Sequence, residues 1–219
     1  MKRLAIAVAA SLFIVAAVLL LTFLNRGQMG KPASASDIHY SVEMGHPLLL
    51  DSEEDCQQNP EAYFVWDGSL SVTLVSCELY SDMAAAGIDA KNSFYREIDS
   101  LPGTGWVYLQ CELKVDNIGA TPRADDGLFD VSTFGLFIEG GSNEYYDSSL
   151  KRPVDYFDGC PESSDEKKKL LFELPKGEGK TFHIGFFVQE SDLSKPMYIC
   201  AGLWSGATKY RLYIPDGLG

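Results

Sequence analysis

The stretch WVYLQCELKVDN, residues 106–117, alternates apolar and polar residues with great regularity. Successive side chains of a β-strand point to opposite faces, so one face of this stretch would be apolar and buried: Val107, Leu109, Cys111, Leu113 and Val115. The other face would be polar: Tyr108, Gln110, Glu112 and Lys114. Because the stretch runs into a turn at Asn117-Ile118-Gly119, it predicts a long antiparallel strand with one face in a core.

The same period of two recurs along the chain. Leu70, Val72 and Leu74 share one face, and the phase then slips by one residue, as a β-bulge between Leu74 and Cys77 would allow. Ser81–Gly87 is predicted to be a short helical turn. Further strands are predicted at residues 129–139, 168–174, 180–188, 197–204 and 209–214. Many strands, little helix and frequent turn signals predict an all-β sandwich or barrel.

An apolar run at the N-terminus predicts a membrane anchor. The 21 residues from Leu4 to Leu24 carry no charge, and at ~1.5 Å per residue a helix of that length spans about 31 Å, close to the ~30 Å core of a bilayer. A cleaved signal peptide has a shorter apolar region, although cleavage near Ala35 is the alternative. We expect an uncleaved single-pass anchor with a cytoplasmic N-terminus, because only three residues precede the run.

The anchor sets the predicted domain organisation. Residues 1–25 form the anchor, and residues 26–37, which are small and polar with Gly and Pro, form a flexible linker. Residues 38–61 form an N-terminal extension with one possible strand, Ile38–Met44, and an exposed acidic loop. Residues 62–219 form the β-sandwich outside the membrane.

Beyond residue 31 the chain is strongly acidic, with 14 Lys and Arg against 31 Asp and Glu and a formal charge of −17. Such a field repels nucleic acid and anionic lipid surfaces, and it favours cationic partners and divalent ions. The charge therefore excludes nucleic acid as a partner.

Five cysteines suggest an oxidising compartment, where thiols tend to pair and an odd number leaves one over. No two of them have the C-x-x-C spacing of a zinc or redox site. Cys77 and Cys111 fall on the apolar faces of their strands, so they could bridge the two sheets or be buried thiols. Cys200, between Ile199 and Ala201, is predicted to point to the opposite face of its strand from these apolar neighbours. It could pair with Cys160, which would make Cys56 the odd cysteine.

Neither catalysis nor a cofactor is expected, because the chain has three histidines and lacks a Gly-x-Ser-x-Gly elbow, a phosphate-binding loop and His-Glu-x-x-His. His183, between Phe182 and Ile184, is predicted to be an exposed strand residue.

Two kinds of metal site could be assembled. Imidazole and thioether groups suit copper, and one segment offers His39, Met44 and His46. Calcium needs several oxygens, which one loop offers through Asp125, Asp126 and Asp130, and another through Asp155, Asp158, Glu162, Asp165 and Glu166. Neither loop has the EF-hand spacing, and solvated loop carboxylates are the commoner explanation.

Four segments carry a resemblance. The long strand ends in VDN (115–117), and FDVSTFGLF (129–137), LFELPKGEGKTFHIGFFV (171–188) and KYRLYI (209–214) follow it. In these segments residues 62–214 resemble the immunoglobulin-like domains of unknown function in bacterial surface proteins and lipoproteins, which are similar in fold to a secreted immunoprotective antigen of mycobacteria. The resemblance implies an extracytoplasmic immunoglobulin-like β-sandwich behind a membrane or lipid anchor, and it carries no catalytic residues. The five cysteines and the N-terminal extension depart from that pattern.

The sequence therefore predicts a membrane-anchored binding or accessory module of the bacterial envelope. Its partner would be an extracellular protein or another envelope ligand, and exposed loop aromatics would be good recognition residues: Tyr145, Tyr146, Tyr156, Phe157 and Trp204. The alternatives are an extracytoplasmic sandwich that binds calcium or copper, and a single-pass subunit of a membrane complex.

Overall fold

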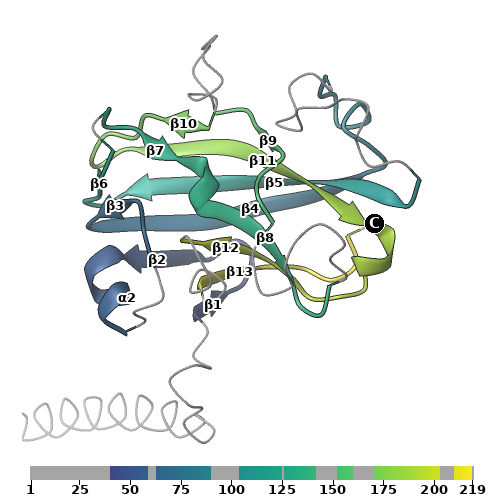
Figure 1. The fold of residues 1–219 in the computed structure, drawn as a ribbon, viewed down its shortest axis with the longest axis horizontal. Coiled ribbons are helices and arrows are strands. Elements are labelled where there is room, and N and C mark those ends of the chain that lie inside the picture. The colour runs from purple at the N-terminus through teal and green to yellow at the C-terminus, as the bar shows by residue number, and fades with distance from the viewer. Residues whose placement is uncertain are drawn as a thin grey trace, which may run out of the picture. The chain divides into compact units, whose positions relative to one another are not determined.

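The computed structural model describes residues 40–58, 63–89, 104–124, 126–141, 152–159, 170–202 and 210–218. These residues form an all-β structure, as the alternation predicted, with most strands antiparallel and one short α-helix (Figure 1). No helix within these ranges is long and apolar enough to cross a membrane. The predicted anchor, Leu4–Leu24, and the linker after it lie outside the described residues.

The larger sheet has five strands in the order β2-β4-β5-β11-β9. Their bounds are Pro47–Asp51 for β2, Ser69–Tyr80 for β4, Trp106–Asn117 for β5, Gly179–Gln189 for β11 and Tyr156–Phe157 for β9. Every neighbouring pair is antiparallel. The register of β4 against β5 shifts between Leu74 and Ser76, which confirms the predicted bulge.

The second sheet has four strands in the order β1-β13-β12-β8. Their bounds are Tyr40–Val42 for β1, Tyr210–Ile214 for β13, Met197–Ala201 for β12 and Phe134–Ile138 for β8. β1 pairs with β13 in parallel, and the other pairs are antiparallel. The N-terminal extension therefore adds one strand to each sheet, β1 to this one and β2 to the five-stranded one.

Short elements complete the fold. Two further pairs of strands are β3 (Trp66–Asp67) with β6 (Thr121–Pro122), and β7 (Phe129–Asp130) with β10 (Leu171–Phe172). Among the described residues, the 3-10 helix η4 (Val131–Thr133) precedes β8, and the 3-10 helix η6 (Glu190–Asp192) follows β11. The predicted strand over 129–139 is therefore split in two by η4.

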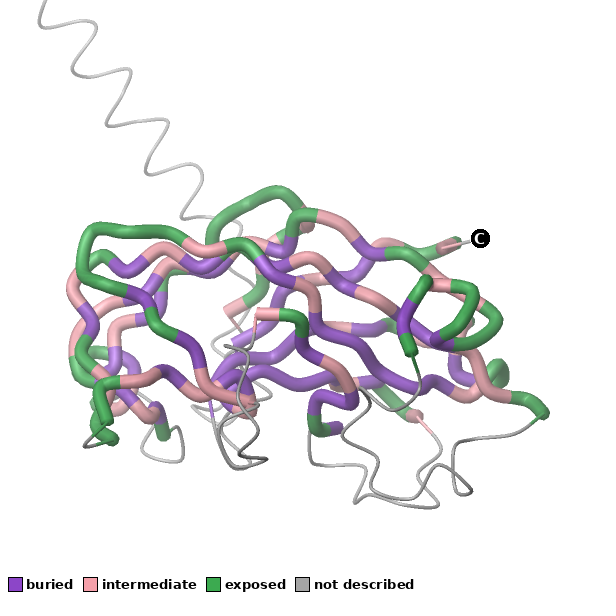
Figure 2. The backbone as a smooth tube through the Cα atoms, turned by 90° about the horizontal axis from the view of Figure 1, so that it is seen from above, coloured by how far each residue is buried: buried purple, intermediate pink, exposed green. Residues whose placement is uncertain are grey.

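The core lies between the two sheets and contains apolar residues of both. The predicted inner face of β5 is confirmed, since Leu109, Cys111, Leu113 and Val115 are fully buried. Buried residues run along the facing strands, while exposed residues gather in the connecting segments (Figure 2).

Tyr108 differs from its prediction. It points to the outer face of β5, as the alternation requires, yet none of its surface is exposed. Met83 and Ile88 cover it, and its ring packs edge to face on Phe187 with centroids 5.6 Å apart. The turn at residues 83–87 thus closes a small second core over the outer face of the five-stranded sheet, and Asp82 caps this turn by accepting from the Ala85 N–H at 2.8 Å.

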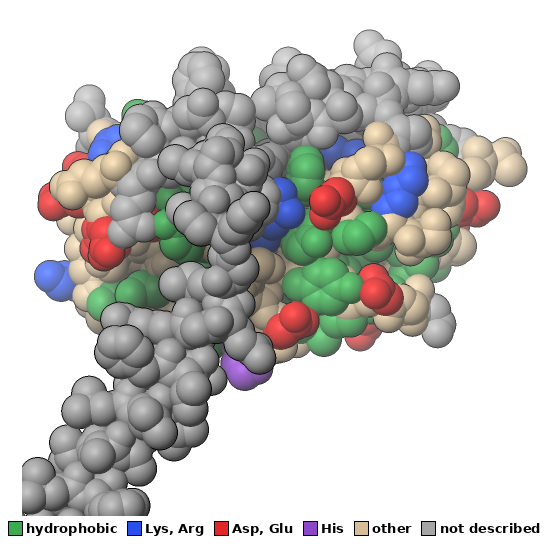
Figure 3. Space-filling view, turned by 90° about the horizontal axis from the view of Figure 1, so that it is seen from below, with side chains coloured by type: hydrophobic (Ala, Val, Ile, Leu, Met, Phe, Trp, Pro, Cys, Tyr) green, Lys and Arg blue, Asp and Glu red, His purple; other side chains and the backbone are tan. Residues whose placement is uncertain are grey.

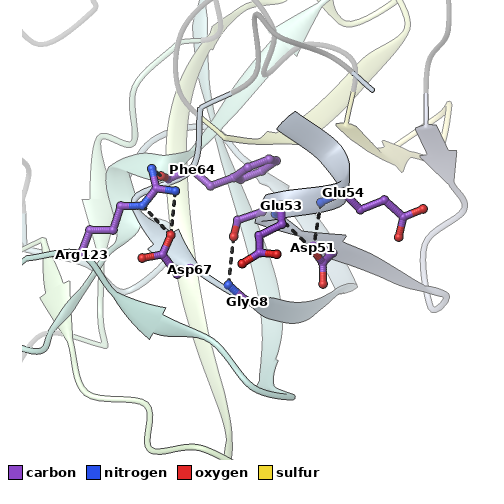
Figure 4. Close-up of polar contacts among 8 residues, drawn as sticks. Asp51, Glu53, Glu54, Phe64, Asp67, Gly68 and Arg123 are labelled. Carbon is purple, nitrogen blue, oxygen red and sulfur yellow. Dashed lines mark hydrogen bonds and ion pairs between the residues drawn. The ribbon is translucent and has the colours of Figure 1, made fainter. Parts of the chain in front are cut away.

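The acidic segment after β2 was predicted to be an exposed loop, but part of it is helical. Helix α2 spans Ser52–Gln58, and Asp51 caps it by accepting from the N–H groups of Glu53 and Glu54 at 3.1 Å each (Figure 4). The Ser52 hydroxyl accepts from the Gly68 N–H at 2.9 Å and so holds the helix against the β3–β4 connection.

Nearby, Arg123 joins the β3 region to the chain after β6. Its guanidinium donates to the Asp67 carboxylate, at 2.9 Å from Nε, and to the Phe64 carbonyl, at 3.0 Å from Nη1 (Figure 4). Asp51 thus caps α2, and Asp67 pairs with Arg123.

Candidate binding surface

The outer face of the four-stranded sheet carries a row of three aromatic rings. Phe137 of β8, Tyr198 of β12 and Tyr213 of β13 lie directly opposite one another in the strand register. The centroid of the Tyr198 ring is 6.4 Å from that of Phe137 and 5.6 Å from that of Tyr213. All three side chains are partly exposed, because their neighbours along each strand point inward into the core.

Arg211 of β13 lies among these rings. Its guanidinium carbon is 4.9 Å from the centroids of both Phe137 and Tyr198, which are cation–π distances. One of its nitrogens is 4.0 Å from the Glu139 carboxylate, which also accepts from the Tyr198 hydroxyl at 3.3 Å. We call Phe137, Tyr198, Arg211 and Tyr213 the aromatic face.

Carboxylates border the aromatic face and act on its phenols. A hydrogen bond to Asp216 raises the pKa of Tyr213 to about 12, with the charge of Glu43 adding to the effect. Burial raises the pKa of Tyr198, and the charge of Glu139 raises it further. Seen from below, the molecule shows hydrophobic side chains at the surface among acidic and basic ones (Figure 3). A rigid row of rings with a polar border suits recognition of another molecule.

Two of the five loop aromatics predicted for this role are described, and neither belongs to the aromatic face. Phe157 is buried in the main core, and Tyr156 packs against the second core. Tyr145, Tyr146 and Trp204 lie outside the described residues. The sequence signal for the aromatic face was the aromatic residue within each of three short apolar strands, but only the strand register shows that the three rings meet.

The predicted copper ligands are not gathered within the described residues. Met44 packs against the main core, whereas His46 is exposed and His39 lies outside the described residues. The part of the chain that the structure describes contains no group of three or more His, Cys, Asp or Glu side chains placed to hold a metal ion.

The predicted calcium ligands have local roles. Asp126 accepts from the Leu128 N–H at 3.1 Å, and Asp130 accepts from the Ser132 N–H at 2.8 Å, where it caps η4. Asp125 lies outside the described residues, as do Glu162, Asp165 and Glu166.

His183 is on the outer face of β11, as predicted, and is partly exposed. Its ring Nδ1 is 2.7 Å from one carboxylate oxygen of Asp158, and its backbone N–H donates to the other at 2.7 Å. Asp158 thereby holds the segment after β9 against β11.

A buried charged cluster ties residues 152–157 to β11 and η6. Asp192 is fully buried, and its carboxylate is 3.0 Å from the Arg152 guanidinium and 2.8 Å from the Lys195 ammonium. Asp155 accepts from the Phe187 N–H at 2.9 Å. Burial raises the pKa of Asp155 to about 7, although that hydrogen bond and the charge of Arg152 both oppose the shift.

Cys77 and Cys111 face each other in one sheet, so of the two predicted alternatives the bridge between the sheets is wrong, whereas the burial of both side chains is confirmed. They are directly opposite on β4 and β5, with their sulfur atoms 3.3 Å apart. Cys200 is buried on β12 and Cys56 is partly exposed on α2, while the predicted partner of Cys200, Cys160, lies outside the described residues. None of the four described cysteines is in a disulfide.

No family model, curated protein or solved structure significantly matches the chain.

Proposed function

We propose that the protein is a non-catalytic binding or accessory module of the bacterial envelope, held by the Leu4–Leu24 anchor, and that it binds its partner through the aromatic face. The observation that carries the proposal is the row of Phe137, Tyr198 and Tyr213 across three neighbouring strands. Aromatic side chains in a rigid sheet give a large contact area with little loss of side-chain freedom on binding.

The strand order supports an immunoglobulin-like fold for this module. Constant-type immunoglobulin domains have strands A, B, E and D in one sheet and C, F and G in the other. The order β4-β5-β11-β9 corresponds to A-B-E-D, and β8-β12-β13 corresponds to C-F-G, in the same chain order. β1 and β2 are then additions from the N-terminal extension.

The charge of the chain favours a particular partner chemistry. With a formal charge of −17 beyond residue 31 and carboxylates around the aromatic face, the module favours a partner that combines apolar and basic groups. An envelope protein with exposed Lys or Arg beside apolar side chains has this chemistry.

Site-specific photo-crosslinking of the full chain in its native cells tests the proposal. A benzophenone side chain in place of Tyr213 should give discrete adducts on irradiation, because that ring lies in the proposed interface. The same group in place of Val75, which is 40% exposed on the outer face of the other sheet, is the matched control and should give none.

A second variant shows whether the adducts depend on the whole row of rings. Phe137→Ser, combined with the label at Tyr213, should reduce the adducts at least tenfold without changing the amount of protein in the membrane. Equal labelling from Val75 and Tyr213, or adducts that survive Phe137→Ser, would count against the aromatic face as the binding surface.

A further inference from the structure

The sulfur atoms of Cys77 and Cys111 are 3.3 Å apart in the main core. The two residues are direct partners in the antiparallel register of β4 and β5, two long neighbouring strands. Only 9% of Cys77 and none of Cys111 is exposed. Two thiols are therefore held side by side by the pairing of the strands.

Strand geometry allows these thiols to be joined. Directly opposite residues of an antiparallel pair have Cα atoms about 4.5–5.5 Å apart, which lies within the ~4.4–6.8 Å found for disulfides. Closing the sulfur atoms to the ~2.05 Å of a covalent bond then requires side-chain rotation but no movement of the strands.

We propose that Cys77 and Cys111 form a disulfide within the five-stranded sheet whenever the chain folds in an oxidising compartment. The other described cysteines lie on different elements, Cys56 on α2 and Cys200 on a strand of the other sheet. Among the cysteines that the structure describes, Cys77 and Cys111 are thus the two that strand pairing places opposite each other.

The chemistry requires an oxidant, and a disulfide-bearing oxidoreductase supplies it. One cysteine thiolate attacks the oxidant's disulfide and forms a mixed disulfide, and the second cysteine displaces the oxidant. The protein loses two thiol protons and two electrons and gains one S–S bond, while the oxidant's disulfide is reduced to two thiols.

Burial determines when this exchange takes place. Exchange needs a thiolate that the oxidant can reach, and burial together with the neighbouring Cys77 raises the pKa of Cys111. The bond therefore forms before β4 and β5 are enclosed in the core. Once the protein is folded, the bond is shielded from reductants and acts as a permanent structural link.

The bond is tested with purified full-length protein in detergent micelles. A variant with Cys56, Cys160 and Cys200 replaced by Ala is refolded in a buffer of oxidised and reduced glutathione, denatured and alkylated, and its mass is measured. We expect a mass two hydrogens below that of the dithiol and no alkylation before reduction, and two alkylated thiols after it. A control that keeps Cys77 and Cys200, with the other three replaced, should be alkylated twice without reduction.

Two alkylated thiols in the Cys77/Cys111 variant before reduction would overturn the proposal. If that variant does not fold, a peptide map of the oxidised wild-type chain decides instead, since it must contain a peptide joining Cys77 to Cys111. Shielding predicts that dithiothreitol reduces the bond at least ~10³-fold more slowly in native buffer than in urea, and equal rates would contradict it. The refolding buffer supplies the oxidant, so the result does not depend on the compartment in which the protein folds in the cell. A chain that does not form the bond would therefore contradict this proposal but not the proposed envelope location.

Discussion

Two aspartate side chains keep their protons to an unusually high pH. Burial raises the pKa of Asp155 to about 7 and that of Asp55 to about 6. Burial likewise raises the pKa of Tyr108, and the nearby Tyr156 and Asp155 add to that shift. Asp55 is close to the charges of Asp51 and Glu54, which add to the effect of its burial. For both aspartates, loss of solvent outweighs the hydrogen bonds that favour the ionised form.

These shifts determine how stability changes with pH. An aspartate in the unfolded chain has a pKa near 3.8. Between about pH 4 and pH 7 the folded protein therefore binds more protons than the unfolded chain does. The contribution of both groups to the unfolding free energy is fully present below pH 4 and is lost as the pH rises to 7.

Asp155→Asn should remove part of this pH dependence. The amide oxygen can still accept from the Phe187 N–H, but the side chain no longer titrates. The decrease of unfolding free energy between pH 5 and 6.5 should become shallower by up to ~1.4 kcal/mol per pH unit, one proton's contribution. Urea unfolding from pH 4 to 8 measures this slope. Glu43→Gln, at an exposed position, should keep the wild-type slope, and an unchanged slope in Asp155→Asn would mean that Asp155 is ionised throughout.

At the scale of elements, the side chain of Tyr108 on β5 lies directly over Gly185 on the neighbouring strand β11. A methyl group on Gly185 would overlap the Tyr108 hydroxyl and ring and lie 2.7 Å from ring atom Cε2. The ring cannot swing away, because Met83, Ile88 and Phe187 enclose it. Glycine at position 185 is thus required by the side chain that lies across it.

Gly185→Ala should therefore lower the unfolding free energy by about 1–3 kcal/mol, the usual cost of overpacking. Urea denaturation of the variant measures the loss. Gly119→Ala is the matched control, since its methyl group would meet only the end of the Lys176 side chain at 3.8 Å, and it should change stability by less than about 0.5 kcal/mol. Equal costs for the two substitutions would show that Tyr108 moves aside.

The alternation of side chains allowed the long elements to be predicted from sequence. β4 with its bulge, β5 and β11 follow the pattern closely, because each has one face in the core. Helix α2 was missed, although Asp51 and Glu54 have the spacing of a capping pair before it. Tyr108 was placed in solvent because its cover comes from residues 83–88, and a strand's own sequence cannot show what lies on its outer face.

The candidate site was predictable only in part. The aromatic residues of β8, β12 and β13 were visible in the sequence, but Tyr198 meets Phe137 and Tyr213 only through pairing with strands about 60 and 15 residues away along the chain. The cysteines show the same limit of local patterns. The sequence pattern correctly predicted that Cys77 and Cys111 point into the core. Only the strand register shows that they lie opposite each other in one sheet.

At the scale of the whole molecule, the N-terminal extension belongs to the sandwich. β1 lies beside β13, and β2 beside β4. Leu48 and Leu50 of β2 are 6% and 0% exposed and belong to the main core. The domain boundary predicted at residue 62 therefore cuts through both sheets.

A chain that begins at residue 62 should be much less stable than one that begins at residue 40. Burial of Leu48 and Leu50 alone contributes ~1.5–3 kcal/mol each, a large share of the ~5–15 kcal/mol that stabilises a typical domain. Urea unfolding of the two fragments, followed by tryptophan fluorescence, compares them directly. The fragment 40–219 should unfold cooperatively, and the fragment 62–219 should be unfolded or unfold at far lower urea; equal midpoints would restore the boundary at 62.

The parallel pairing of β1 with β13 also fixes how the protein responds to force. The chain enters both strands at the same end, with Tyr40 beside Tyr210, and leaves β13 at the opposite end. A pull on the residues before Tyr40, against a load held at Tyr213 or at the C-terminus, therefore slides β1 along β13 rather than peeling it away. In this shear geometry all the hydrogen bonds of the pair carry the tension together, so a load applied to the residues before Tyr40 is resisted at the strand where it enters the fold.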